Sequence, residues 1–121
     1  MIEERTFAFS LRIIETYRYL LERKEFVLSK QLLRAGTSIG ANVAEAQAAI
    51  SRKEFTAKMS IAAKEARESV YWLRLLDRSG YLTDFSRSSE LLAEAQSINL
   101  IICKIVKTAQ KSPATRGAKS S

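Results

Sequence analysis

Three glutamates and one cysteine are the side chains of this sequence that could do chemistry. Glu45 could form a carboxylate pair with Glu65 or Glu68 if two helices brought them together, and such pairs serve general acid–base catalysis. The chain has no histidine, however, and so lacks both the commonest general base and the Glu-x-x-His pairs of di-iron bundles. Cys103 stands among isoleucines and a valine, as a small core side chain does. We therefore predict a protein that is not an enzyme and binds no metal or cofactor; a carboxylate enzyme is the alternative.

Glu65 and Glu68 also have a simpler interpretation. Lys64 and Arg67 are their close neighbours in the sequence. Oppositely charged side chains three or four residues apart pair along the solvated face of a helix. We expect the two glutamates to lie on such a face.

The composition indicates which elements must position these residues. Ala, Leu, Glu, Lys and Arg make up half of the chain, whereas it contains only four glycines and one proline, as is typical of long helices. Apolar residues recur at helical spacing over residues 4–23, 28–49, 51–80 and 84–110, with short polar joints between them. The pattern predicts an all-α protein, an up-down-up-down antiparallel four-helix bundle formed by residues 1–111. Residues 112–121 offer little apolar surface, which predicts a disordered polar and basic tail.

Each predicted helix has an apolar stripe that we expect to face the core. In the first the stripe is Phe7, Leu11, Ile14 and Leu21, widened by Ile13, Tyr17 and Leu20. In the second helix the stripe is Leu32, Gly36, Ile39, Val43, Ala46 and Ile50. In the third it is Phe55, Met59, Ala62, Ala66, Ser69, Leu73 and Leu76. In the fourth it is Leu91, Ala95, Ile98, Ile102, Ile105 and Ala109.

Local signals mark some helix ends. Ser51 and Glu54 form an S-x-x-E capping box ahead of the third helix, and Gly80 supplies the left-handed residue that ends it. The second helix is predicted to be capped by Ser29 or to start just before it.

The second helix is crowded with small residues. Gly36 and Gly40 lie four residues apart, where they let a neighbouring backbone approach closely. Asn42 and Glu45 are three residues apart and share a face. We interpret Asn42 as one partner of an interhelical hydrogen bond that fixes register, with a ligand or assembly contact as the alternative.

Positive charge is the second functional signal. The net charge is +7, the pI is near 9.8, and the excess lies in the second half of the chain. The candidate nucleic-acid-binding residues recur on two helix faces and are Arg67, Arg74, Arg78, Lys104, Lys107 and Lys111. Nucleic acid is the usual polyanion partner of so basic a domain. Stabilisation of helix C-termini is the alternative for Arg78, Lys107 and Lys111.

The third helix has more apolar surface than one bundle stripe needs. Six of the seven residues 70–76 are apolar. Helices that are apolar on two faces usually bury the second against another subunit. We expect Trp72 to make such a subunit contact; the rim of the protein's own core is the alternative.

Residues 31–46 carry a family resemblance. They read QLLRAGTSIGANVAEA and resemble the Q-x-x-R-A-x-x-S-I-x-x-N-[IV]-A-E-[GA] signature of the four-helix bundle proteins encoded by intervening sequences in bacterial 23S ribosomal RNA genes. The similarity continues through residues 51–55, 61–66, 68 and 71–73, and covers residues 7–107. Ala46 departs mildly from the glycine common there, which suggests slightly looser packing.

The resemblance implies a cyclic homo-oligomer, with a pentameric barrel favoured. It also implies kinship with the accessory variability determinant of diversity-generating retroelements, which binds nucleic acid through a positive exterior and engages a reverse transcriptase. Arg34, Ser38, Asn42 and Glu45 match the signature, which implies helix packing or subunit contact and no catalytic role.

These observations lead to one expected function and one rival. We expect a non-enzymatic oligomeric accessory protein that binds RNA, a ribonucleoprotein or DNA through its basic helix faces, with a reverse transcriptase as one candidate partner. The rival is a protein–protein scaffold whose charge attracts an acidic partner. No apolar run is long enough to span a membrane, so we expect a cytoplasmic protein without membrane contact.

Overall fold

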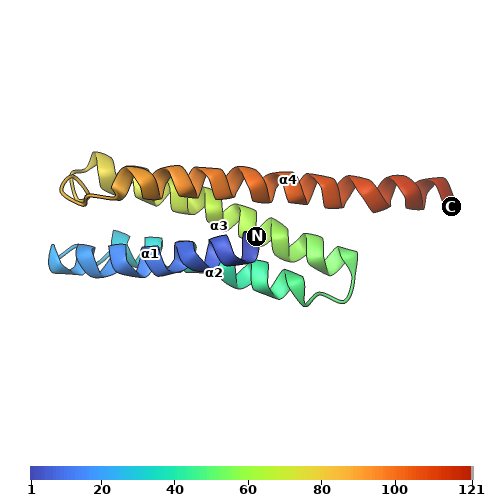
Figure 1. The fold of residues 1–121 in the computed structure, drawn as a ribbon, viewed down its shortest axis with the longest axis horizontal. Coiled ribbons are helices and arrows are strands. Elements are labelled where there is room, and N and C mark those ends of the chain that lie inside the picture. Colours follow the sequence, from blue (N-terminus) through green and yellow to red (C-terminus); the bar gives the residue numbers. More distant parts are fainter. Residues whose placement is uncertain (121) are drawn as a thin grey trace.

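The computed structural model describes the backbone of residues 1–120 and the side chains of residues 1–111. Within this range the chain forms four helices: α1 (Ile2–Glu22), α2 (Leu28–Gln47), α3 (Arg52–Arg78) and α4 (Ser88–Ser120). Figure 1 shows consecutive helices running in opposite directions. The predicted all-α four-helix architecture is confirmed. The side chains of the predicted tail, residues 112–121, lie outside the described part, so the tail stays a prediction.

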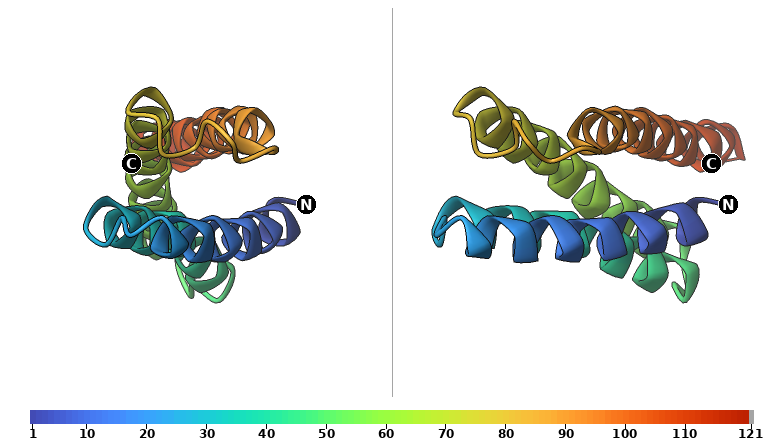
Figure 2. Two further views of the ribbon diagram at one scale, coloured as in Figure 1. Left: turned by 90° about the vertical axis from the view of Figure 1, so that its left-hand side faces the viewer. Right: turned by 60° about the vertical axis from the view of Figure 1, so that its left-hand side comes forward.

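The helices pack mainly with their neighbours in sequence. α2 packs against both α1 and α3, α3 packs against α4, and α1 and α4 meet along a thinner seam. Figure 2 shows α1 and α2 as one layer, with α3 running obliquely from that layer to α4. No described helix has the length and apolar character needed to cross a membrane.

The core stripes of α2, α3 and α4 follow the predicted spacing. Most of their members are completely or almost completely buried. Phe55 and Ile105 are exceptions, because both side chains are only partly buried. Ile50 is a second kind of exception: it is 95% exposed, since α2 ends at Gln47 and the chain turns before reaching it.

The predicted stripe of α1 is correct for Ile13 and Leu20, which are fully buried, but wrong for Phe7 and Leu11. Phe7 and Leu11 are 67% and 56% exposed, whereas the buried face of this helix is Thr6, Phe9, Ile13, Thr16 and Leu20. Two apolar rows wind around the segment, so spacing alone could not identify the inner one. The buried row includes threonines, whose hydroxyls donate to carbonyls of their own helix and so need no partner elsewhere.

Close contact between α1 and α2 depends on two glycines, as expected. A Cβ at Gly36 would lie 2.7 Å from the Ile13 side chain, and one at Gly40 would lie 3.2 Å from the Thr6 carbonyl oxygen. Larger side chains at either position would push the two helices apart.

The ends of α3 agree closely with the predicted signals. Ser51 caps the helix by accepting a 3.0 Å hydrogen bond from the Glu54 amide, while the Glu54 carboxylate accepts from the Ile50 amide. Gly80 has φ +95°, and the next amide, of Tyr81, donates back to the Leu76 carbonyl. This is a Schellman C-cap.

α2 starts at Leu28, which confirms the predicted start just before Ser29, and Ser29 lies inside the helix rather than at its cap. The buried Glu25 carboxylate accepts hydrogen bonds from the amides of Val27, Leu28 and Ser29, the last at 2.6 Å. Ser29 instead donates its hydroxyl to the Glu25 carbonyl at 2.7 Å. One carboxylate thus satisfies three free amides of the first turn and favours the positive end of the helix dipole.

Candidate functional site

A three-residue ion cluster links α2 to α3 at the family signature. Arg34 donates to both carboxylate oxygens of Glu65, at 3.1 and 3.2 Å, and to Glu68 at 2.5 Å. The Glu65 side chain is only 8% exposed, so it does not lie on the solvated face that we expected. Both carboxylates accept from one guanidinium, which makes this cluster a structural clamp between helices.

Ser38 and Asn42 continue the signature along α2. Ser38 donates to the Arg34 carbonyl at 2.6 Å, and the Asn42 amide nitrogen donates to the Ser38 carbonyl at 2.9 Å. The Asn42 side chain therefore makes a hydrogen bond within its own helix, and the predicted interhelical hydrogen bond is wrong. Glu45 is exposed and lies about 16 Å along the helix from Arg34. It is not brought to Glu65 or Glu68.

Within residues 1–111, the carboxylates and the thiol that could do chemistry are not brought together into a site. No group of three or more His, Cys, Asp and Glu residues among residues 1–111 is placed to hold a metal ion. Cys103 is partly buried, and its sulfur lies 3.6 Å from the side-chain oxygen of Asn99. Three surfaces of the described chain are further candidate functional features.

The first surface is basic and aromatic. Tyr71, Arg74, Leu75 and Arg78 line a shallow depression on the C-terminal half of α3, which we call the Tyr71 patch. Tyr71 is 58% exposed, and neither arginine makes an ion pair within residues 1–111. Arg67, also exposed, precedes Tyr71 by one helical turn. The patch thus offers unpaired guanidinium groups beside an accessible ring.

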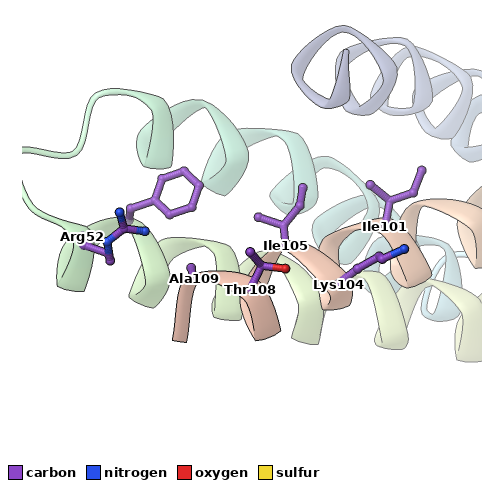
Figure 3. A pocket seen from close by; sticks show the side chains of 7 residues that line it. Arg52, Ile101, Lys104, Ile105, Thr108 and Ala109 are labelled. Carbon is purple, nitrogen blue, oxygen red and sulfur yellow. The ribbon is translucent and has the colours of Figure 1, made fainter. Parts of the chain in front are cut away.

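The second surface is a groove between the start of α3 and the later part of α4 (Figure 3). Its volume is about 420 Å³, and its lining residues, which define the α3/α4 groove, are Arg52, Phe55, Ile101, Lys104, Ile105, Thr108 and Ala109. Lys107 and Lys111 are exposed on the same helix. Lys104 lies about 24 Å along α4 from its first residue, whereas Arg78 ends α3 beside that start. The six candidate cations thus fall into two groups.

The third surface was missed in the sequence. It is a groove of about 480 Å³ between α1 and α2, and its lining residues, which define the α1/α2 groove, are Glu3, Phe7, Ser10, Leu11, Ile14, Thr37, Gly40, Ala41 and Ala44. Phe7 and Leu11 had been assigned to the core, and this assignment hid the groove. The signal was present as the second apolar row of α1.

Trp72 lies at the rim of the core. Its ring meets Tyr71 edge-on at 5.1 Å between centroids, and its partly buried side chain packs against the core cluster. The indole Nε1 is buried without a hydrogen-bond partner among the described residues. In the single chain, Trp72 packs between the core and the ring of Tyr71.

These features define the class of protein, which is a four-helix bundle. The chain matches the family model of the 23S rRNA-intervening sequence protein over residues 1–104, and it belongs to that family. A crystal structure of a protein of unknown function from the S23 ribosomal protein family of Bacteroides thetaiotaomicron is similar, with 44% identity and a TM-score of 0.84. The similarity covers 89% of this chain and all of that one. No curated protein matches the chain.

Proposed function

We propose that this protein is a non-enzymatic accessory protein of the cytoplasm that assembles with its own copies and binds nucleic acid, RNA foremost. The observation that carries the proposal is the Tyr71 patch. Arginines without protein partners bind phosphates, and an exposed aromatic ring beside them stacks on an unpaired base. The net charge of +7 supports the same interpretation, because it draws a polyanion to the whole surface.

Self-assembly is supported by apolar surface. Phe7 and Leu11 leave more than half of their side chains exposed, and the two apolar grooves described above have no cover within residues 1–111. Exposed apolar patches of this kind usually mark contact with another protein. The family resemblance favours a pentameric ring, and a reverse transcriptase is a candidate further partner.

The test of RNA binding is a salt titration. A fluorescein-labelled single-stranded RNA of about 20 nucleotides is followed by fluorescence anisotropy at 50 and 200 mM salt. If the protein neutralises about four phosphates, Kd weakens roughly 50-fold between these salt concentrations. Absence of binding at 50 mM salt, or binding that salt does not weaken, contradicts the proposal.

Charge reversal then tests the patch itself. Arg74→Glu with Arg78→Glu should weaken Kd by roughly tenfold or more, because two phosphate contacts become repulsive. The matched control is Arg18→Glu with Lys30→Glu, which changes net charge equally at exposed positions of α1 and α2. Tyr71→Ala should weaken Kd by about fivefold or more, since stacking contributes about 1–3 kcal/mol per base. Equal effects of the two reversals would assign binding to net charge alone.

The apolar α1/α2 groove favours one second candidate, a protein–protein scaffold. In that case RNA binding is absent, and the protein forms its complexes through the groove. Leu11→Asp would then abolish partner binding, whereas the Arg74 and Arg78 reversals would leave it intact.

A further inference from the structure

Apolar residues that the helical spacing assigns to the core remain uncovered at two places. Phe7 and Leu11 lie in the α1/α2 groove, and the partly exposed Phe55 and Ile105 lie in the α3/α4 groove. The two grooves share no helix and no lining residue. The described chain therefore presents two separate apolar surfaces.

The α3/α4 groove is open because the bundle is incomplete around it. Figure 1 shows that α1 begins level with the middle of α4, so the later turns of α4 continue past it beside α3. Figure 3 shows Ile101 and Ile105 directed into the space between α4 and the opposite helices. At this end of the single chain, no fourth helix within residues 1–120 covers the apolar side chains of α3 and α4.

The two grooves carry opposite charges. Glu3 is the one charged residue that lines the α1/α2 groove. Arg52 and Lys104 are the charged residues that line the α3/α4 groove. Contact between two copies of the same groove would oppose like charges, whereas contact between unlike grooves would bring Glu3 to cations.

The sizes of the side chains also fit this pairing. Gly40, Ala41 and Ala44 line the α1/α2 groove with little more than backbone and methyl groups, which leaves room for a bulky side chain. Phe55 and Ile105 of the other groove are bulky and partly exposed.

We propose that the α1/α2 groove of one copy packs against the α3/α4 groove of the next. The inference rests on the proposed self-assembly and names its surfaces. Such a contact is heterologous, so an open chain of copies leaves one groove of each kind free, at its two ends, until a ring closes. Lys104 then belongs to the subunit contact, and the Tyr71 patch stays available to nucleic acid.

Mixing two variants tests the head-to-tail contact. Leu11→Asp disables the first groove and Ile105→Asp the second, and masses are measured by light scattering after size-exclusion chromatography. Each variant alone should be a monomer, and an equal mixture should form a complex of two chains only, because one intact groove of each kind remains. Leu100→Asp is the matched control: Leu100 is 71% exposed on α4 outside both grooves, and its variant should keep the wild-type mass.

The other outcomes separate this inference from the proposed function. A monomeric wild-type protein overturns both self-assembly and the head-to-tail contact, whereas RNA binding is judged by its own titration. If the wild-type protein is an oligomer, two results overturn the head-to-tail contact and leave self-assembly intact. One is that either variant alone still assembles, and the other is that two monomeric variants do not combine when mixed.

If circular dichroism shows that an aspartate variant is unfolded, a charge exchange between the two grooves tests the head-to-tail contact instead. Glu3→Lys and Lys104→Glu should each weaken self-association by roughly tenfold, and the double variant should recover most of that loss. A double variant no better than the singles overturns the contact.

Discussion

Arg5 of α1 and Glu94 of α4 form a two-point ion pair between the first and last helices. The guanidinium Nη2 and Nε atoms donate to the two carboxylate oxygens at 2.8 and 2.9 Å, and Nη2 also donates to the Ser97 hydroxyl at 2.9 Å. Two longer ion pairs continue along this seam, from Arg12 to Glu90 and from Arg23 to Asp84. Charged contacts thus join two helices that meet only along a thin seam.

This ion pair predicts how the stability of the seam depends on pH. Hydrogen bonding from Arg5 lowers the pKa of Glu94 below its ordinary value, although partial burial opposes the shift. A carboxyl with a lowered folded-state pKa contributes stability above its unfolded pKa, near 4.3, and that contribution disappears as the pH falls through the folded value. Glu94→Gln should therefore reduce the free energy of unfolding by about 0.5–1 kcal/mol at pH 7, and the difference should vanish in acid.

Urea denaturation of both proteins at equal concentration between pH 7 and 3 measures this difference. Glu22→Gln is the control, since Glu22 is exposed and makes no ion pair within residues 1–111. A difference that grows toward low pH would contradict the assigned direction.

The Arg34 clamp predicts a strong coupling between α2 and α3. Arg34→Leu leaves the buried Glu65 carboxylate without its cation, which should cost about 1–3 kcal/mol of stability. Adding Glu65→Leu should recover part of this loss, because no uncompensated charge remains buried. Arg67→Leu, at an exposed arginine of α3 without an ion pair in the described range, should change stability by less than about 0.5 kcal/mol. Strictly additive effects of the Arg34 and Glu65 changes would contradict the clamp.

The contact between Gly36 and Ile13 predicts that the effect of Gly36→Ala on stability changes sign when Ile13 is shortened. Gly36→Ala should destabilise the protein by about 1–3 kcal/mol, because the new Cβ would meet the Ile13 side chain at 2.7 Å. In an Ile13→Ala background the same change should stabilise it, since the obstacle is gone and alanine has the higher helix propensity, by about 1 kcal/mol. Thermal unfolding of the four proteins measures both effects. A destabilising Gly36→Ala in both backgrounds would show that the obstacle is not Ile13.

The sequence predicted those parts of the fold that leave a local signal. The core stripes of α3 and α4 follow the helical spacing, and the Ser51 cap and Gly80 turn are recognisable within a few residues. α1 has two apolar rows, and only packing against Gly36 and Gly40 selects the inner one. The choice between rows is a tertiary effect.

The candidate site was less predictable for a related reason. The partners Arg34 and Glu65 are 31 positions apart, so their nearest charged neighbours in the sequence suggested a different pairing. The exposed basic residues could be identified as a set, but their division into two groups depends on how α3 and α4 pack, with Arg78 beside the start of α4 and Lys104 far along it. The Glu25 cap has no standard motif, because a glutamate outside the helix folds back onto its first turn.

The buried threonines of α1 determine how this helix can separate from the rest. The hydroxyls of Thr6 and Thr16 are already bonded to carbonyls of their own helix, at 2.9 and 2.8 Å, so they keep their partners if α1 moves. Detachment would expose apolar side chains and break a few ion pairs, but it would leave no hydroxyl of this buried face unpaired. A partial opening in which α1 leaves as an intact helix, hinged at the short connection to α2, therefore breaks no hydroxyl hydrogen bond of this buried face.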